Sequence, residues 1–402
     1  MSTAIDDVST RQDTPPSKHR QNSLTAGQKP GWVWMAIAAA AVLLGLGIEA
    51  LLSGAAPFSE DFSLARFVVL AGVLYIAGMY LVTRVMENRR RASDGLWKNL
   101  VWTAFLIALV PLVSVIWTVL EGGGPTLLSN PQVLWNDMDG VTGATDAAYD
   151  QAGSPAGGLP GGFAHALIGT LVITIIATLI AVPIGMLASI YLVEYGRDGW
   201  LSRAITFFVD VMTGIPSIVA GLFAFALMEL VITTFIGDTP RHLQMVKMGF
   251  TASVALSVLM IPVVVRSTEE MLRVVPNELR EASYALGVRK WRTITKIVIP
   301  TAISGIASGI TLAIARVAGE TAPILVTAGF VANFNWNVFD DMMTALPVYI
   351  YRQMIFPSAA QAPDPSIDRA WAAALMLILI VMALNLIARI IAKAFAPKKT
   401  GR

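Results

Sequence analysis

The most regular feature of the sequence is an alternation of long apolar segments with shorter polar or charged ones. Eight segments are apolar over the roughly 20 residues that a helix needs to cross the hydrocarbon core of a bilayer. These candidate spans are residues 32–52, 64–83, 96–120, 163–193, 204–236, 249–265, 297–330 and 371–394. The pattern therefore predicts an all-α, polytopic helical membrane protein whose longer spans are tilted or include interfacial helix.

Composition agrees with a membrane protein and excludes several other classes. Hydrophobic residues make up 55% of the chain and charged residues only 14%, which excludes an ordinary soluble domain. The net charge of +2 is too small to indicate nucleic-acid binding. The absence of cysteine excludes disulfides and thiolate metal sites, and the three histidines show no zinc-ligand spacing. We therefore expect no metal, no cofactor and no nucleic acid on this chain.

The basic residues predict the orientation of the spans. They gather in segments 84–98, 197–203, 273–296 and 393–402. With eight spans, all of these segments fall on one side of the membrane, whereas loop 121–162 is acidic and has neither Lys nor Arg. Since short cytoplasmic loops are enriched in Lys and Arg, we expect both termini to be cytoplasmic. The short loop with Arg241 and Lys247 runs against this rule.

The stretch 276–300 is a charged interruption between two apolar spans. Pro276 and Asn277 predict a helix start with Asn277 as the N-cap, and Gly287 predicts its end, so we expect a short helix over 278–286. Its small, weakly apolar face combines residues at helical spacing, namely Leu279, Ala282, Ser283 and Leu286. Such a face suits docking into a groove on another protein.

The spacing of this stretch resembles the EAA loop of ABC importer permeases. The matching positions are Glu281, Ala282, Ser283, Gly287, Ile297, Ile299 and Pro300. Ser283 and Ile299 are mild departures from the Ala and Leu of that pattern. In this family the short helix is the coupling helix, which sits in a cleft of the ATPase subunit. The resemblance implies ATPase-coupling roles for Glu278, Leu279, Glu281, Ala282, Ser283, Leu286 and Gly287. The alternative is an ordinary amphipathic loop helix.

Charged residues inside apolar spans are candidates for function, because a charge in hydrocarbon costs at least a few kcal/mol. Arg316 and Glu320 lie four positions apart beside Gly319 and Pro323, which break regular helix. They either line a substrate path or form a buried ion pair that holds the bundle together. Arg266 ends the sixth span; it either joins the path or extends to the interface.

Several segments together closely resemble the PstA family, the permease subunits of bacterial phosphate ABC importers. They are residues 190–197, 215–223, 261–276, 279–287 and 312–323, and the resemblance covers about residues 98–393. It implies a type I ABC importer permease core of six helices in the bacterial cytoplasmic (inner) membrane. Arg266 and Arg316 match arginines that the family uses in the phosphate path, and Glu320 matches the acid beside them.

The resemblance also implies an import complex. Its other members are a sister permease of PstC type, two ATPase subunits of PstB type that bind ATP and Mg, and an external phosphate-binding protein of PstS type. The chain has no GxxxxGK[ST] loop, so we expect no enzyme activity on it and hydrolysis on the partner. Alternatives are a permease for sulfate or molybdate, an ion-coupled secondary transporter, or a structural or sensory subunit.

The domain organisation follows from these assignments. We predict a disordered cytoplasmic tail over 1–30, an accessory transmembrane hairpin over 31–85 and a basic cytoplasmic turn over 86–96. The permease transmembrane domain then covers 97–395 and contains the coupling loop 276–300. A basic cytoplasmic tail over 396–402 ends the chain.

Overall fold

The computed structural model describes residues 29–54, 63–153, 158–196, 199–237 and 242–395. The predicted tails 1–30 and 396–402 lie almost wholly outside these residues. The described part is helical and contains no strand. Contacts divide the chain into two compact units, Met1–Val115 and Ile116–Arg402, which we call unit 1 and unit 2 and describe separately.

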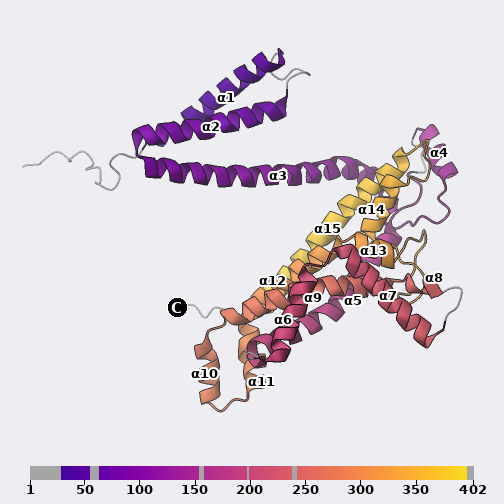
Figure 1. Ribbon diagram of the computed structural model, residues 1–402. Helices are drawn as coiled ribbons and strands as arrows, with labels where there is room; N and C mark the ends of the chain where they lie inside the picture. The colour runs from indigo at the N-terminus through magenta and orange to yellow at the C-terminus, as the bar shows by residue number, and fades with distance from the viewer. Residues whose placement is uncertain (1–28, 55–62, 154–157, 197–198, 238–241, 396–402) are drawn as a thin grey trace, which may run out of the picture. The chain divides into compact units, whose positions relative to one another are not determined.

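Unit 1 contains helices α1 (Val33–Ser53) and α2 (Leu64–Met86) and the first part of α3 (Arg89–Ser129). The predicted N-terminal pair of helices is present, with α1 and α2 forming a hairpin (Figure 1). The buried Glu49 carboxylate accepts hydrogen bonds from Arg66 near the turn, at 2.9 and 3.1 Å. The predicted basic turn over 86–96 is wrong in extent, because α3 begins at Arg89 and only residues 87–88 lie between the helices.

Unit 2 contains the remaining helices. In chain order they are η1 (Pro131–Leu134), α4 (Gly143–Gln151), α5 (Ala164–Ile190), η2 (Tyr191–Tyr195), α6 (Trp200–Thr213), α7 (Ser217–Phe235), α8 (His242–Val246), α9 (Gly249–Val274), α10 (Asn277–Ala285), α11 (Lys290–Thr293), η3 (Ile294–Val298), α12 (Ile299–Ala318), α13 (Ala322–Thr327), α14 (Leu346–Ile355) and α15 (Asp364–Phe395). The segments η2 and η3 are π-helical: η2 continues α5, and η3 leads from α11 into α12. Such π-bulges occur frequently at functional sites.

Helices α5 and α9 form the centre of unit 2. Three serine hydroxyls lie between these helices, each within hydrogen-bond distance of one carbonyl of its own helix and one of the other. Ser253 is 2.9 Å from Gly249 and 3.3 Å from Ile173, Ser257 is 2.7 Å from Ser253 and 3.3 Å from Ala177, and Ser189 is 2.7 Å from Gly185 and 2.9 Å from Val265. Small polar side chains allow close approach and hold apolar helices together where no water competes. The main buried cluster surrounds this pair and includes Leu256, Met260 and Val264.

Helix α12 packs closely on α9 because glycines face the contact. A Cβ atom at Gly305 would collide with the Met271 side chain, and one at Gly309 with Ser267. The GxxxG spacing of this span therefore permits the close approach of two helices, as such spacings do in membranes.

Among the described residues, eight helical segments are long and apolar enough to cross a membrane. This confirms the predicted number and the multi-pass membrane class. The long predicted span 204–236 is divided between two helices, because α6 ends at Thr213 and α7 begins at Ser217, and only α7 is long and apolar enough to cross a membrane. Pro216 has an extended backbone, with ψ of 137°, and its ring disfavours a helical conformation in the preceding residue. Pro216 therefore separates two helices, whereas Pro183 and Pro262 lie inside α5 and α9.

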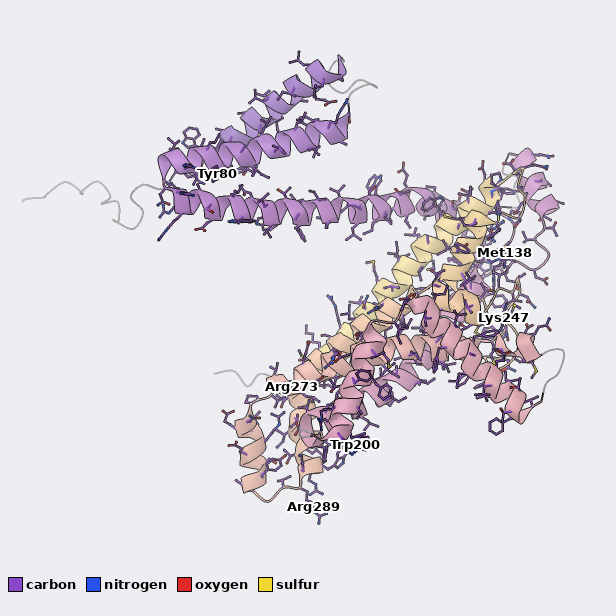
Figure 2. The ribbon with its side chains drawn as sticks, in the orientation of Figure 1. Tyr80, Met138, Trp200, Lys247, Arg273 and Arg289 are labelled. Carbon is purple, nitrogen blue, oxygen red and sulfur yellow. The ribbon has the colours of Figure 1, made fainter. Side chains whose placement is uncertain are left out.

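The two ends of unit 2 differ in the charge of the loops that they carry. Figure 2 shows Met138 at one end and Arg289 at the other. The end with Met138 carries α4 and α14, and the end with Arg289 carries α10, α11 and the last turns of α15 (Figure 1). The acidic loop 121–162 and the basic stretch 273–296 therefore lie at opposite ends of the unit.

Candidate functional site: the exposed helix α10 and the arginines of α9 and α12

Helix α10 is the predicted short helix, with a start one residue earlier than expected. Pro276 has the extended backbone of the cap position, and Asn277 is the first helical residue, so the prediction of Asn277 as N-cap is wrong. The end is as predicted: Gly287 has φ of +73°, a left-handed conformation that glycine adopts without strain. The backbone N–H of Gly287 donates to Tyr284 at 2.9 Å, and that of Val288 to Ser283 at 3.2 Å.

Arg280 attaches α10 to the ends of α5 and α9. Its guanidinium donates two hydrogen bonds to the Glu194 carboxylate, at 2.9 and 3.0 Å. It also donates to the backbone carbonyls of Leu272 at 2.9 Å and Val275 at 2.6 Å. The Arg280 side chain is 12% exposed and that of Glu194 5%, so this is a largely desolvated, charge-assisted contact. Sequence reasoning gave Arg280 no role.

Lys290, which follows the turn after α10, binds the same η2 segment as Arg280. Its ammonium group donates to the backbone carbonyl of Glu194 and lies 4.6 Å from the centroid of the Tyr195 ring. Both Arg280 and Lys290 therefore meet the π-helical segment η2. The turn between α10 and α11 is therefore attached to η2 at Arg280 and Lys290, whereas Leu286 and Gly287 in the turn itself are exposed.

The outward surface of α10 differs from the predicted docking face at one residue. Leu279 is 42% exposed and Leu286 83%, and Glu278, Glu281, Ala282 and Gly287 are exposed as well. Ser283 is buried, and its hydroxyl lies 2.8 Å from that of Thr293. The expectation that Ser283 belongs to the outward face is therefore wrong, since the side chain packs against the α11 end of the turn.

Tyr284 adds a polar group to the exposed surface of α10. Its side chain is 41% exposed. Partial burial, together with the nearby Glu194 carboxylate, raises the pKa of the Tyr284 hydroxyl. The hydroxyl therefore remains protonated near neutral pH and can donate a hydrogen bond.

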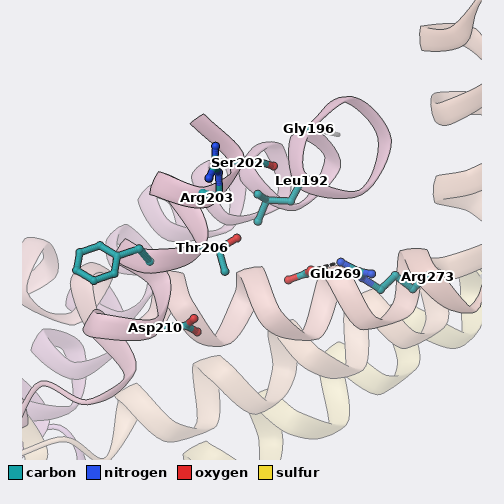
Figure 3. Close-up of a pocket in the computed structure, with 9 residues that line it drawn as sticks. Leu192, Gly196, Ser202, Arg203, Thr206, Asp210, Glu269 and Arg273 are labelled. Carbon is teal, nitrogen blue, oxygen red and sulfur yellow. Dashed lines mark hydrogen bonds and ion pairs between the residues drawn. The ribbon is translucent and has the colours of Figure 1, made fainter. Parts of the chain in front are cut away.

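Arg266 lies within α9 and does not extend freely to an interface. It is ion-paired with Asp210 of α6 and with Glu269, which accepts its hydrogen bond at 3.0 Å. The other oxygen of Glu269 accepts from Arg273 at 2.7 Å. Next to these groups is a cavity of about 480 Å³ between η2, α6 and α9. Figure 3 shows the side chains of Asp210, Glu269 and Arg273 around it.

Arg316 and Glu320 do not form the ion pair that was one of the two expectations from the sequence. Helix α12 ends at Ala318, so Glu320 lies in the break before α13, beyond the last turn that carries Arg316. Within the described residues, no ion pair joins the two side chains, and Arg316 is exposed. The alternative of a buried Arg316–Glu320 pair is therefore wrong. The predicted break beside Gly319 is confirmed.

A buried ion pair at the opposite end of unit 2 was missed by sequence reasoning. Arg369 is fully buried and donates to both carboxylate oxygens of Asp146, at 2.9 and 2.6 Å. It also donates to the Pro160 carbonyl at 2.8 Å. This contact joins α4, the segment before α5, and the start of α15. The only available signal was a basic residue at the edge of an acid-rich segment.

The class of the protein follows from its helices and from its match to a protein family. The sequence model of this family, described as "Binding-protein-dependent transport system inner membrane component", matches residues 181–401, more than half of the chain. The protein is thus a multi-pass membrane subunit of a transporter, and residues 181–401 include α9, α10 and α12.

Curated relatives give the particular family. The "Phosphate transport system permease protein PstA 1" of Mycobacterium tuberculosis is 44% identical over 77% of this chain and 92% of its own length. PstA of Mycobacterium leprae is 43% identical over 76% of this chain and 90% of its own length. PstA of Yersinia pestis is 41% identical over 54% of this chain and 66% of its own length. The chain belongs to the PstA family of phosphate transport system permeases.

Two solved structures that the chain resembles are distant matches. One is the MetNI methionine ABC transporter, at a TM-score of 0.43 and 19% identity, covering 58% of this chain and 94% of that one. Another is a bacterial ABC transporter for alginate import, at a TM-score of 0.44 and 15% identity, covering 74% and 98%. Similarity at this level adds nothing to the assignment.

Proposed function

We propose that this chain is the permease subunit of an ATP-driven phosphate importer, in which it forms half of the translocation path. The observation that carries the proposal is the identity of 44% to a phosphate transport system permease over 92% of that protein's length. Sulfate, molybdate and ion-coupled secondary transport are less favoured, because the curated relatives reported above are named as phosphate permeases.

The end of unit 2 that carries α10 is then the cytoplasmic end. The basic stretch 273–296 supports this orientation, as does the acidic loop 121–162 at the other end. With eight spans, both termini are then on the cytoplasmic side as well. The membrane is the bacterial inner membrane, which the words "inner membrane component" in the family description support.

Helix α10 is the part that couples transport to ATP hydrolysis. Its exposed residues, Leu279 and Leu286 above all, offer an apolar surface that a groove on an ATPase can cover. Because Arg280 and Lys290 bind the base of the turn to η2, a displacement of α10 reaches α5 and α9 directly. ATP and Mg bind to the ATPase, and hydrolysis takes place there.

The complete importer contains further subunits. We propose a PstC-type sister permease, two PstB-type ATPase subunits and a PstS-type phosphate-binding protein on the outer side. The acidic loop 121–162 would not attract phosphate, which supports capture by a separate binding protein.

The phosphate path includes Arg316, Glu320 and Arg266. The Arg316 guanidinium is exposed and has no ion-pair partner in the described part of the chain, so its donors are available to a tetrahedral oxyanion. Glu320 lies in the non-helical break beside it. Discontinuous helices of this kind often line substrate sites in transporters.

The test is ATP-dependent uptake of radioactive phosphate into vesicles that contain this chain with its candidate sister permease, ATPase and binding protein. We expect uptake that unlabelled phosphate competes and that sulfate and molybdate do not. Competition by either of those ions would reassign the substrate, and uptake without ATP would contradict the importer class.

A further inference from the structure

The two carboxylates that bind Arg266 are held very differently. Glu269 is 11% exposed and accepts from both Arg266 and Arg273, on either side of it along α9. Asp210 is 58% exposed and comes from α6. Within the described residues, the Asp210 carboxylate has Arg266 as its one side-chain partner. Of the two, Asp210 is the carboxylate that can leave at small cost.

The surroundings of Asp210 can accept a small anion. The adjoining cavity of about 480 Å³ is within the size range of small-ligand sites. Its polar lining consists of Ser202, Arg203, Thr206, Asp210, Glu269 and Arg273. Arg266 does not line the cavity, but it is ion-paired with two residues that do, Asp210 and Glu269. Counting Arg266, the arginines of this group outnumber the carboxylates. If Asp210 left, the site would carry a larger excess of positive charge.

Carboxylate and phosphate compete for the same donors on an arginine. Both are oxyanions that accept charge-assisted hydrogen bonds from the guanidinium fork. The carboxylate of Asp210 therefore occupies the Arg266 donor that phosphate would use. The cavity is lined by residues of η2, α6 and the last part of α9, up to Arg273, and the chain passes from the end of α9 to α10 within three residues. It therefore lies toward the end of unit 2 that carries α10, where imported phosphate leaves.

We infer that Asp210 is a built-in competitor for phosphate at Arg266, which displaces the ion toward the cytoplasm and resets the site. The inference rests on the proposed function. In this role Asp210 tunes how long phosphate remains at Arg266 by occupying the same guanidinium in its absence. A site with Arg266 alone would bind the ion more tightly and release it more slowly.

The experiment uses the purified complex of this chain with its sister permease and ATPase, without the binding protein. Binding of radioactive inorganic phosphate is measured by equilibrium dialysis, and the maximal uptake rate is measured in vesicles after the binding protein is added. For Asp210→Asn we expect binding about tenfold tighter than in the wild type, as for the loss of one competing charge-assisted contact. We also expect a lower maximal rate.

Three further variants test whether the tighter binding in Asp210→Asn comes from the loss of the Asp210 charge next to Arg266. Asp210→Glu restores the charge and is expected to restore binding and rate toward the wild type. Arg266→Gln combined with Asp210→Asn is expected to remove the gain in binding. Glu270→Gln is the matched control, because Glu270 is an exposed acid on α9 with no ion pair to Arg266 among the described residues, and it is expected to change neither quantity.

The outcomes separate this inference from the proposed function. Wild-type uptake of phosphate with unchanged binding in Asp210→Asn would overturn the inference and leave the importer assignment intact, with Asp210 only joining α6 to α9. Absence of ATP-dependent uptake in the assembled wild type would overturn both. Asp210→Ser provides a second neutral variant, and failure of both neutral variants to assemble would show a structural role and overturn the inference.

Discussion

The attachment of α10 through Arg280 gives a sharp prediction about local stability. Arg280→Met removes two hydrogen bonds to Glu194 and two to backbone carbonyls, while the methionine fills part of the space. It leaves the Glu194 carboxylate, 5% exposed, without its guanidinium. Removing one partner of a buried pair costs roughly 3–5 kcal/mol. Because α10 has few other contacts, we expect this cost to lower the free energy of local opening of the turn.

Hydrogen–deuterium exchange measures that opening. Each 1.4 kcal/mol changes an equilibrium constant tenfold, so peptides covering 277–288 are expected to exchange about a hundredfold faster or more in Arg280→Met, up to the limit of their wild-type protection. Exposed Arg289→Met is the matched control and is expected to leave exchange unchanged. Replacing both members, as Glu194→Met with Arg280→Met, is expected to recover part of the protection. Wild-type exchange rates in Arg280→Met would refute the idea that this ion pair holds the coupling helix.

Three further predictions concern other parts of the chain. Arg316→Gln is expected to abolish phosphate uptake, because it removes the guanidinium that would bind phosphate. The complex should still assemble, because Arg316 is exposed and its removal leaves no buried charge unpaired. Normal uptake would exclude a role for Arg316 in the phosphate path. Gly309→Leu is expected to lower the melting temperature and the yield of the complex, since the leucine side chain would collide with α9. Ser308→Leu is the control and is expected to be tolerated, because Ser308 is exposed. Equal effects of the two substitutions would contradict the packing argument. Asp146→Asn is expected to destabilise the opposite end of unit 2 by roughly 3–5 kcal/mol, because it leaves Arg369 buried and uncompensated, and faster limited proteolysis near α4 would report this.

The sequence predicted the features that depend on local chemistry. Eight apolar segments were sufficient to predict the number of candidate spans. Pro276 and Gly287 delimit α10 because their backbone preferences act on neighbouring residues alone. The break beside Gly319 was predictable for the same reason.

The missed features depend on residues far apart in the chain or on an uninterrupted hydropathy signal. Arg280 meets Glu194 across 86 positions, and Arg369 meets Asp146 across 223, so no local pattern connects them. The break at Pro216 was missed because hydropathy remains high on both sides of it. Ser283 was assigned to the wrong face because its partner, Thr293, becomes its neighbour only when the chain reverses after Gly287.

The close packing of α5 on α9 has a consequence for the transport cycle. A Cβ atom at Gly185 of α5 would lie 2.7 Å from the Val264 side chain of α9, so sliding one helix along the other would force side chains into the neighbouring helix. We therefore expect α5 and α9 to turn as one rigid body when α10 is displaced. Hinge motion is then expected at non-helical breaks, among them those at residues 214–216 and 319–321. The second of these breaks contains Glu320 and directly follows the last turn of α12, which carries Arg316, so bending there would also change the surroundings of the proposed phosphate contact.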